Sequence, residues 1–402
     1  MDLPLRTATA DDYEAIAALL GGVFHTVYDE EELAVERPLH DPTRSLVVTD
    51  GDEIVGHAAA FDRQMTVPGA VLPCAHVTGV GVAPTHRRRG ILRSLMTRQL
   101  RDTAAAGREP IAALWASESA IYPRFGYGYA GGRLRFEARV PDTGFPAPGV
   151  GRLRAASPAA VRSELVKVYD EARATRPGWS SRDENWWTYL LADTASRRDG
   201  FTPLRAILHE DPEGTVDGYA LWRSQRRWTD RGPEGEVQIQ ELAALGPDAY
   251  RELWRFLLSI DLVRTVTYGM ATPDEPLLHL VPEPRHLGAT LADALWVRVV
   301  SLPEALRARS YRTPFDVVIE VTDPLLPENA GRWRVTPDAC DRTTAPADLA
   351  CDILDLGAVY LGGTSLSTLA RAGRVRELRR GALSAVDTAF GWDRAPCGSD
   401  IF

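Results

Sequence analysis

Cysteine is scarce in this sequence, and the positions of the cysteines exclude one common kind of site. The 402 residues include only Cys74, Cys340, Cys351 and Cys397, which lie far apart in the chain. No Cys-x-x-Cys pair and no Cys/His cluster occurs, so a zinc site is not expected and no metal is predicted. We expect four buried free thiols in a protein of the reducing cytoplasm.

Long uncharged apolar runs are missing as well. No stretch of about 18 such residues occurs, so no transmembrane helix is expected, and the N-terminus lacks the pattern of a signal peptide. Lys167 is the single lysine, and arginine supplies the remaining basic residues. The formal net charge of −9 argues against bulk nucleic-acid binding and suits a cationic substrate. We therefore predict a cytoplasmic protein with neither a nucleic-acid partner nor a membrane span.

The first of three blocks covers residues 1–142 and alternates strands with helices. Apolar alternation and the turn Asp50-Gly51-Asp52 predict a hairpin, and a 3.6-residue period that ends at Gly107 predicts an amphipathic helix. The strands are expected at residues 4–8, 45–50, 53–65, 75–84 and 110–116, and the helices at 13–24 and 91–107.

The second block, residues 143–290, follows a Pro/Gly-rich connection and repeats the strand–helix–strand pattern. Its strands are expected at 218–225, 236–244 and 264–271, with a helix at 249–260. The third block, residues 291–402, carries a hairpin over 314–337 and helical patterns over 346–363 and 366–378.

The stretch "VTGVGVAPTHRRRGILRSLM" of the first block carries an unusual charge pattern where a strand gives way to a helix. Arg87, Arg88, Arg89 and Gly90 stand at the start of that helix. The free N–H groups and dipole of a helix N-terminus attract anions and repel cations, so three arginines are costly there without an anion. Glycine lets the backbone approach a ligand closely. The motif predicts a pyrophosphate site, and the second block, which reads "LGPD" at the corresponding place, lacks one.

These residues resemble the coenzyme A-binding motif of the GNAT acetyltransferases, with Leu92 departing from the small residue usual at the last position. The stretches "VAPTHRRRG", "ASESAIYPRFGYGYA" and "SLPEALRARSY", with a terminal phenylalanine, resemble the enhanced intracellular survival (Eis) family over essentially the whole chain. The resemblance implies an α/β (α+β) protein with tandem GNAT folds, each a mixed central sheet flanked by helices. Residues 1–142 would be catalytic, 143–290 a degenerate GNAT-like domain, and 291–402 a sterol-carrier-protein-like domain ending in a functional C-terminus.

The resemblance also implies acetyl transfer from acetyl-CoA to several amines of aminoglycoside-type polycations, in a homohexamer linked to antibiotic resistance. Two strands would splay apart beside the cofactor, with strand-like pairing of the pantetheine along the first. The expected cofactor contacts are Val80, Gly81, Val82, Arg87, Arg88, Arg89, Gly90, Ile91, Leu92, Arg93 and Ser117.

Acetyl transfer also needs groups that move protons, because an alkylammonium has a pKa of about 10 and the departing thiolate needs a proton. Of the nearby tyrosines, Tyr127 and Tyr129 are interpreted as packed aromatics, and the resemblance makes Tyr122 the general acid. It also makes the terminal carboxylate of Phe402 the base. Asp29, Trp115 and Asp400 are candidate substrate contacts. Relatives carry an aromatic residue where this chain has Gly79, and Trp115 is the candidate to replace that bulk.

Other functions stay open from the sequence. The same cofactor chemistry would serve a protein-lysine or polyamine acetyltransferase. A lipid-binding protein that keeps a relic acetyltransferase domain is an alternative of another class, as is a scaffold whose role is its oligomer. The acidic run 29–32 is also typical of a solvated helix face, and the tryptophans near Trp186 of a domain core or interface.

Overall fold

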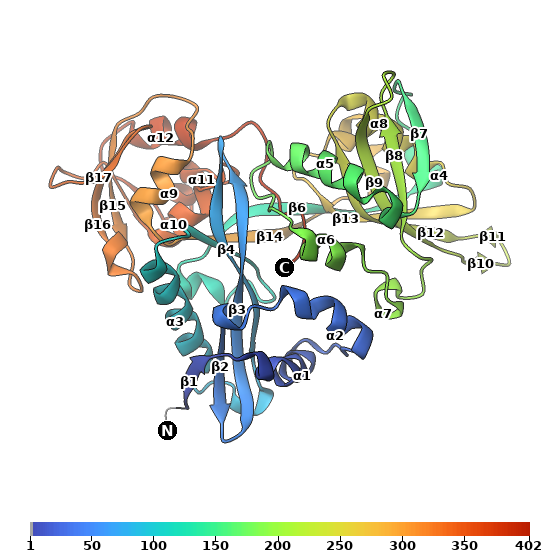
Figure 1. The fold of residues 1–402 in the computed structure, drawn as a ribbon. Coiled ribbons are helices and arrows are strands. Elements are labelled where there is room, and N and C mark those ends of the chain that lie inside the picture. Colours follow the sequence, from blue (N-terminus) through green and yellow to red (C-terminus); the bar gives the residue numbers. More distant parts are fainter. Residues whose placement is uncertain (1–2) are drawn as a thin grey trace.

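Three units of secondary structure make up the chain, and one continuous sheet joins the first two (Figure 1). The computed structural model describes residues 3–402. Twelve strands form the continuous mixed sheet, five strands form the sheet of the C-terminal unit, and helices flank both. The predicted α/β class is confirmed.

The first unit has the five strands and two helices that its sequence pattern predicts, and in addition β6, α2 and α4, which were not predicted. Helix α3 ends at Gly107, which adopts the left-handed φ of 63° that favours glycine at a helix end. The strands are β1 (Leu5–Thr7), β2 (Ser45–Asp50), β3 (Glu53–Val67), β4 (Ala70–Val82), β5 (Ile111–Trp115) and β6 (Gly128–Arg139). The helices are α1 (Tyr13–Phe24), α2 (Glu30–Glu36), α3 (Ile91–Ala106) and α4 (Val140–Thr143).

The second unit repeats this organisation and continues the same sheet. Its strands are β7 (Arg152–Ala156), β8 (Arg205–Glu210), β9 (Val216–Gln225), β12 (Gly235–Ala244) and β13 (Val263–Ala271), with a small hairpin of β10 (Trp228–Thr229) and β11 (Gly232–Pro233). Its helices are α5 (Arg162–Arg173), α6 (Glu184–Leu191), α7 (Ala195–Arg198) and α8 (Pro247–Leu258).

Strand β14 (Thr290–Val299) closes the sheet of the first unit, although it follows the second unit in sequence. It lies between β5 and β6 and is antiparallel to both, which gives the strand order β1-β2-β3-β4-β5-β14-β6-β13-β12-β9-β8-β7. Strand β6 pairs with β14 along one part and with β13 along the other. The structure thus places residues 290–299 in the large sheet, whereas the sequence pattern grouped 291–299 with the third block.

The third unit follows β14 and packs helices on a five-stranded sheet of order β17-β16-β15-β18-β19. Its elements are α9 (Leu302–Ala308), β15 (Val317–Thr322), β16 (Gly331–Val335), β17 (Cys340–Arg342), β18 (Leu349–Asp352), α10 (Ile353–Val359), α11 (Leu366–Arg371), β19 (Arg376–Glu377) and α12 (Ala382–Phe390). The continuous helix predicted over 346–363 is wrong at its start. Residues 349–352 form a strand because the edge of β15 offers parallel pairing, and Asp352 then caps α10.

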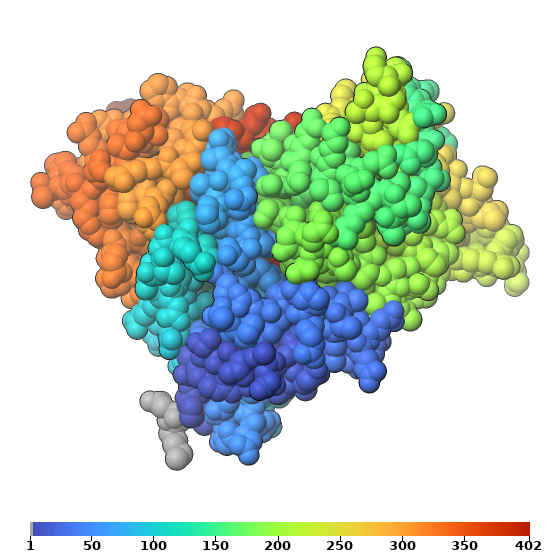
Figure 2. Space-filling view, viewed as in Figure 1, coloured from blue at the N-terminus to red at the C-terminus, as the bar shows by residue number. Residues whose placement is uncertain are grey.

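A hairpin arm formed by β3 and β4 holds the three units together. Figure 2 shows this arm, in light blue, between the second unit in green and the C-terminal unit in orange. At its tip, the Ser310 backbone N–H donates to the Pro68 carbonyl. Along its side, Thr66 exchanges backbone hydrogen bonds with Gly178 and Trp179 of the second unit. The long hairpin is therefore a structural joint as well as part of the sheet.

The C-terminal segment passes between the first and second units, where glycines leave room for its backbone. A Cβ on Gly178 would lie 2.5 Å from the carbonyl oxygen of Cys397, and one on Gly131 would lie 2.8 Å from that of Pro396. The Cys397 N–H donates to the Pro177 carbonyl at 3.1 Å. Larger residues at these glycines would push the segment out of its groove.

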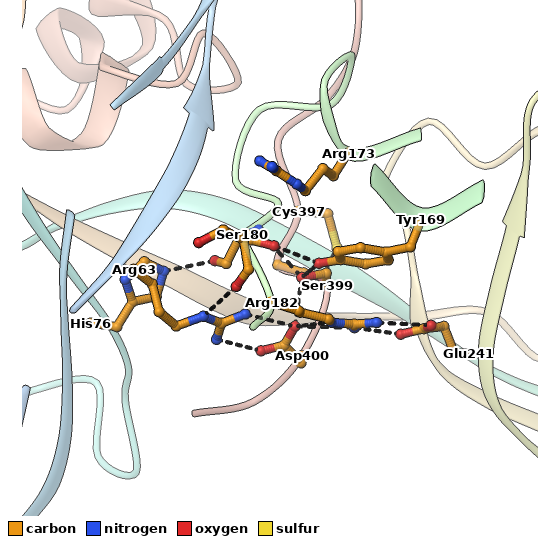
Figure 3. A network of polar contacts seen from close by, with 12 residues as sticks. Arg63, His76, Tyr169, Arg173, Ser180, Arg182, Glu241, Cys397, Ser399 and Asp400 are labelled. Carbon is orange, nitrogen blue, oxygen red and sulfur yellow. Dashed lines mark hydrogen bonds and ion pairs between the residues drawn. The ribbon is translucent and has the colours of Figure 1, made fainter. Parts of the chain in front are cut away.

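A buried ion-pair network fastens the end of this segment (Figure 3). The Asp400 carboxylate, which is 7% exposed, accepts hydrogen bonds from Arg63 of β3 at 2.8 Å and from Arg182 at 3.1 Å. Arg182 also donates to both carboxylate oxygens of Glu241 on β12. Burial alone would raise the pKa of Asp400, but the charges of Arg63 and Arg182 outweigh it and hold that pKa well below its usual range.

Neutralising this carboxylate should release the segment. For Asp400→Asn we expect the free energy of local opening to fall by about 3 kcal/mol, because two buried arginines lose a charged partner. The Cys397 amide should then exchange its hydrogen about a hundredfold faster at pH 7 in native-state exchange measurements. The matched control is Asp338→Asn, since Asp338 is exposed and forms no ion pair among residues 3–402.

The same pair of proteins gives a pH test. An unfolded aspartate has a pKa of about 3.9, so the lowered pKa of Asp400 makes its contribution to stability complete above that value and lost as pH falls below it. The difference in exchange between the wild-type protein and Asp400→Asn should therefore shrink below about pH 4. A difference that persists unchanged in acid would show that the network is not what fastens the segment.

Candidate active site

Strands β4 and β5 separate partway along their length. Their parallel pairing runs only from Cys74 opposite Ile111 to His76 opposite Ala113, whereas β4 continues to Val82. Among the described residues, the β5-facing backbone edge of β4 beyond this point has no strand partner. Unpaired N–H and C=O groups on such an edge can pair with an extended ligand as with an added strand. Val80, Gly81 and Val82 lie on this edge.

Helix α3 begins beside this edge in a conformation suited to an anion. Its N-cap is Gly90, with φ of 85°, and no side chain caps the first N–H groups. A Cβ added to Gly90 would have no neighbour within 4 Å, so the approach to the helix start is open. Arg88 also has a positive φ, of 63°. The loop therefore turns the N–H groups at Ile91, Leu92 and Arg93 toward an open surface that favours negative charge.

The arginines of this loop add positive charge at the same place. Arg87, Arg88, Arg89 and Arg93 are exposed, and none of them forms an ion pair with any residue of 3–402. His86, in contrast, is buried and bonded to Asp50 at 3.0 Å. The free arginines are therefore available to a ligand with several negative charges, as a diphosphate has.

A cavity of about 500 Å³ opens from the separated strands toward the second unit. Five of the predicted site residues line this cavity, and one of them is the last residue of the chain. They are Val80, Trp115, Ser117, Tyr122 and Phe402. The same wall includes residues of α1, of the segment around α2, and Trp186 and Tyr189 of α6. Residues far apart in sequence therefore meet at one cavity beside the strand edge and the arginine-rich loop before α3.

Tyr122 is held as a neutral phenol. It is 5% exposed and starts the short 3-10 helix Tyr122–Phe125. Burial raises its pKa, and the neighbouring Ser117 side chain offsets only part of this effect. A tyrosine that keeps its proton at neutral pH can donate it to a basic atom in the cavity. Tyr127 is fully buried, and Tyr129 does not line the cavity.

Phe402 lies at the cavity because the network around Asp400 anchors the chain two residues earlier. Its ring packs edge-on against His76, with 4.5 Å between ring centroids. Ile401 and Phe402 both line the cavity, whereas Asp400 does not. The prediction that Asp400 contacts substrate is therefore corrected, because its carboxylate is committed to Arg63 and Arg182.

Asp29 also differs from its predicted role. Its side chain accepts a hydrogen bond from the Glu32 N–H at 2.8 Å, so it caps α2, and it is not among the cavity residues. Aspartate is favoured at helix N-caps for this reason. Glu36, the last residue of the same acidic helix, does line the cavity. No pattern in the sequence indicated this position.

The space at Gly79 is filled by His57 and Leu20, and Trp115, which the sequence offered for this place, is not among the three nearest neighbours there. Gly79 has a φ of 57° in an irregular part of β4, and a Cβ there would lie 3.0 Å from the His57 ring. The Nδ1–H of His57 donates to the Gly79 carbonyl at 2.6 Å. Burial lowers the pKa of His57 to about 4, so the ring is neutral at pH 7. A histidine in an alternating strand gave no sequence signal for this role.

The second unit has no comparable charge at its matching helix. Helix α8 begins at Pro247 after an extended Gly246 and carries the acidic Asp248 in its first turn. An acidic side chain stabilises a helix N-terminus but repels an anion. Helix α8 therefore lacks the open, arginine-rich start that α3 has.

The described residues provide neither a metal-binding cluster nor a membrane-spanning helix. In residues 3–402, no group of three or more His, Cys, Asp or Glu side chains is arranged to hold a metal ion. No helix of residues 3–402 is long and apolar enough to cross a membrane. All four cysteines are buried and unpaired, as predicted.

Family models match nearly the entire chain. Models of the acetyltransferase (GNAT) domain match residues 4–130 and 178–299, and a model of the sterol carrier protein domain matches residues 302–398. The last match begins after β14, in agreement with the position of that strand in the large sheet.

Similarity to known proteins extends over full lengths. An uncharacterized N-acetyltransferase of Streptomyces avermitilis is 43% identical, and the N-acetyltransferase Eis of Mycobacterium tuberculosis is 36% identical, each over 98% of both chains. The crystal structure of Eis1 from Mycobacterium abscessus superposes with a TM-score of 0.87 at 33% identity, covering 99% of this chain and 100% of that one. Sequence, domain order and structure agree, and the chain belongs to the Eis family of GNAT N-acetyltransferases.

Proposed function

We propose that this enzyme transfers acetyl groups from acetyl-CoA to amines of aminoglycoside-type polycations. GNAT acetyltransferases use acetyl-CoA. The single observation that carries the proposal is the convergence of Tyr122, Ser117 and Phe402 on one cavity beside the open edge of β4. The family's homohexamer, several acetylations per substrate and a cytoplasmic location are part of the same proposal and rest on the resemblance.

The residues of the first unit fit coenzyme A. The backbone of Val80–Val82 would pair with the pantetheine arm, and the N–H groups from Gly90 to Arg93 would hold the pyrophosphate. The open space at Gly90 and the unpaired charges of Arg87, Arg88 and Arg89 support this assignment. When bound there, acetyl-CoA supplies the acetyl group as a reactive thioester.

The two proton transfers are assigned to the Tyr122 hydroxyl and to the terminal carboxylate of Phe402. The amine nitrogen forms a bond to the acetyl carbon while the carbon–sulfur bond breaks. The Tyr122 hydroxyl gives its proton to the departing sulfur, and Ser117 orients that hydroxyl. The amine's proton passes to the terminal carboxylate of Phe402, which also attracts the cationic substrate. The anchoring of Asp400 supports this role because it fixes where the terminal carboxylate lies.

The cavity wall supports a cationic amine as the acceptor. Glu36 and Asp41 contribute carboxylates, and His57 stays neutral because its pKa is about 4. Arg133 is the one arginine among the described cavity residues. Burial lowers its pKa, and it donates to the Gly269 carbonyl at 3.0 Å. Acidic groups facing an enclosed space concentrate cations there.

The function is tested by thiol release from acetyl-CoA with a panel of aminoglycosides, polyamines and lysine peptides, followed by product masses. The wild-type enzyme should acetylate aminoglycosides. Tyr122→Phe should lower kcat by about 10²–10³-fold, the usual range for a lost general acid, and leave acetyl-CoA affinity unchanged. Tyr129→Phe, outside the cavity, is the matched control. Acetylation confined to peptides or polyamines would overturn the substrate assignment, and equal kcat in Tyr122→Phe would overturn the acid.

The anion loop is tested by binding. Replacing both Arg87 and Arg88 by alanine should weaken acetyl-CoA binding about tenfold or more, with a smaller difference at high salt because the contacts are exposed. Calorimetric titration at two salt concentrations measures this. Arg101→Ala is the control, since Arg101 is exposed on the same helix but far from its N-terminus. Unchanged affinity in the double variant would remove these arginines from the cofactor site.

The terminal carboxylate is tested by moving it. One glycine added after Phe402 should abolish turnover, because the carboxylate is displaced by a residue while the Asp400 network stays intact. Circular dichroism and acetyl-CoA binding should match the wild-type protein, and an N-terminal glycine extension should be fully active. Full activity of the C-terminally extended enzyme would contradict a catalytic carboxylate at Phe402.

A further inference from the structure

One carboxylate of the cavity wall has no partner in the protein. Glu36, the last residue of α2, is partly buried, and its side chain forms neither a hydrogen bond nor an ion pair with residues 3–402. One turn earlier on the same helix, Glu32 is bonded to Thr194 at 3.0 Å and is paired with Arg197. Arg197, the nearby arginine, is therefore already paired with Glu32. A partly buried carboxylate without a partner is costly unless a ligand supplies a positive charge.

Aromatic side chains from three separate segments surround this carboxylate. Tyr13 of α1, Tyr28 before α2 and Tyr189 of α6 all line the cavity, and the charge of Glu36 acts on the pKa of each. The hydroxyl of Tyr13 donates to the Leu33 carbonyl at 3.1 Å, which fixes its ring against α2. Tyrosine faces attract ammonium groups through their quadrupole, and they do so more strongly when water is excluded. Two of the three rings already lie under a cation of the protein, Tyr13 under Arg37 at 4.4 Å and Tyr189 under Arg197 at 4.2 Å. Among residues 3–402 no cation lies over the ring of Tyr28, so this ring is available to a ligand.

We propose that Glu36, with Tyr28 of the same cavity wall, forms a subsite for a second ammonium group of the substrate. The proposal rests on the acetyl transfer described above and names its specificity-determining residue. The two amines have different requirements. The amine that reacts must lose its proton, whereas the amine held at Glu36 must keep it. Because Leu20, Phe24 and Leu39 make other parts of the wall apolar, a diamine whose two nitrogens are separated by an apolar segment fits both positions and is a minimal form of the proposed polycation.

The protonation of Glu36 gives this subsite a pH dependence. Burial, followed by the charge of Glu32, raises the pKa of Glu36 to about 7, and Arg197 opposes the shift. Of the other groups that face it, Tyr13 and Tyr28 have pKa values of about 12, and burial raises that of Tyr189. Burial lowers the pKa of His40, another cavity residue, so that ring is uncharged near neutrality. The subsite therefore gains its negative charge as pH rises through about 7.

The test compares hexamethylenediamine with hexylamine, which has the same carbon chain and one nitrogen fewer. In the wild-type enzyme, KM for the diamine should be at least tenfold lower than KM for the monoamine, and this ratio should grow between pH 6 and pH 8. Glu36→Gln should raise KM for the diamine about tenfold and flatten the pH dependence of the ratio. KM for hexylamine should rise much less, by about twofold or less, because its single nitrogen occupies the reacting position and is affected by Glu36 only through the general attraction of the wall for cations.

Two variants separate charge from structure. Glu36→Asp keeps the carboxylate and should retain part of the preference for the diamine. Glu31→Gln removes an equal charge from an exposed position on the same helix and should behave like the wild-type enzyme. An equal KM for the two amines in the wild-type enzyme would overturn the subsite, as would the same shift for both amines in Glu36→Gln.

Failure of the subsite can be told apart from failure of the proposed chemistry. If the wild-type enzyme acetylates neither amine, the acetyl-transfer proposal fails for alkylamines, and calorimetric binding of each amine to the unreacted protein decides the subsite. Tighter binding of the diamine, lost in Glu36→Gln, supports the subsite without any turnover. Equal binding of the two amines overturns it.

Discussion

The ion pairs that two arginines form with the Asp400 carboxylate are the constraint on which the cavity depends. Arg63 comes from the first unit and Arg182 from the second, and the aspartate belongs to the segment that follows the third. Each charge is buried, so each one is tolerable only while the others are present. Because Phe402 lies two residues farther along, the position of the chain end is set by an ion pair that no single unit can form.

This arrangement shows what the second unit contributes, although its helix α8 lacks the arginines found at the start of α3. Arg182 and Glu241 hold the chain end, and Trp186 and Tyr189 form part of the cavity wall. Arg63 lies over the ring of Trp186 at 3.9 Å, so an arginine that fastens the segment also packs against a residue of the cavity wall. The second unit thus contributes to the candidate site of the first unit through side chains that lie where the two units meet.

The sequence predicted the local features well and the long-range ones poorly. Helix α3, its glycine ends and the alternating strands were predictable because near neighbours decide them, and the family resemblance then placed Tyr122 and Ser117 at one site. Asp29 and Asp400 were misassigned because a carboxylate's role depends on which donors reach it in space. The start of β18 was read as helix, since a short apolar run fits either structure. His57 and Glu36 gave no signal, because their roles come from residues packed against them.

The place of β14 has a consequence for how the protein acquires its structure. Strands β5 and β6 are both made early, yet the strand that fills the gap between them comes from residues 290–299. Until that part of the chain has been synthesised, each strand keeps an open edge with unpaired backbone groups. Pairing of β14 with β5 and β6 is slow because many residues separate these strands in the sequence. Until then, the unpaired edges of β5 and β6 can associate with other chains. During synthesis, the first unit therefore has to stay partly open until the whole second unit has been made.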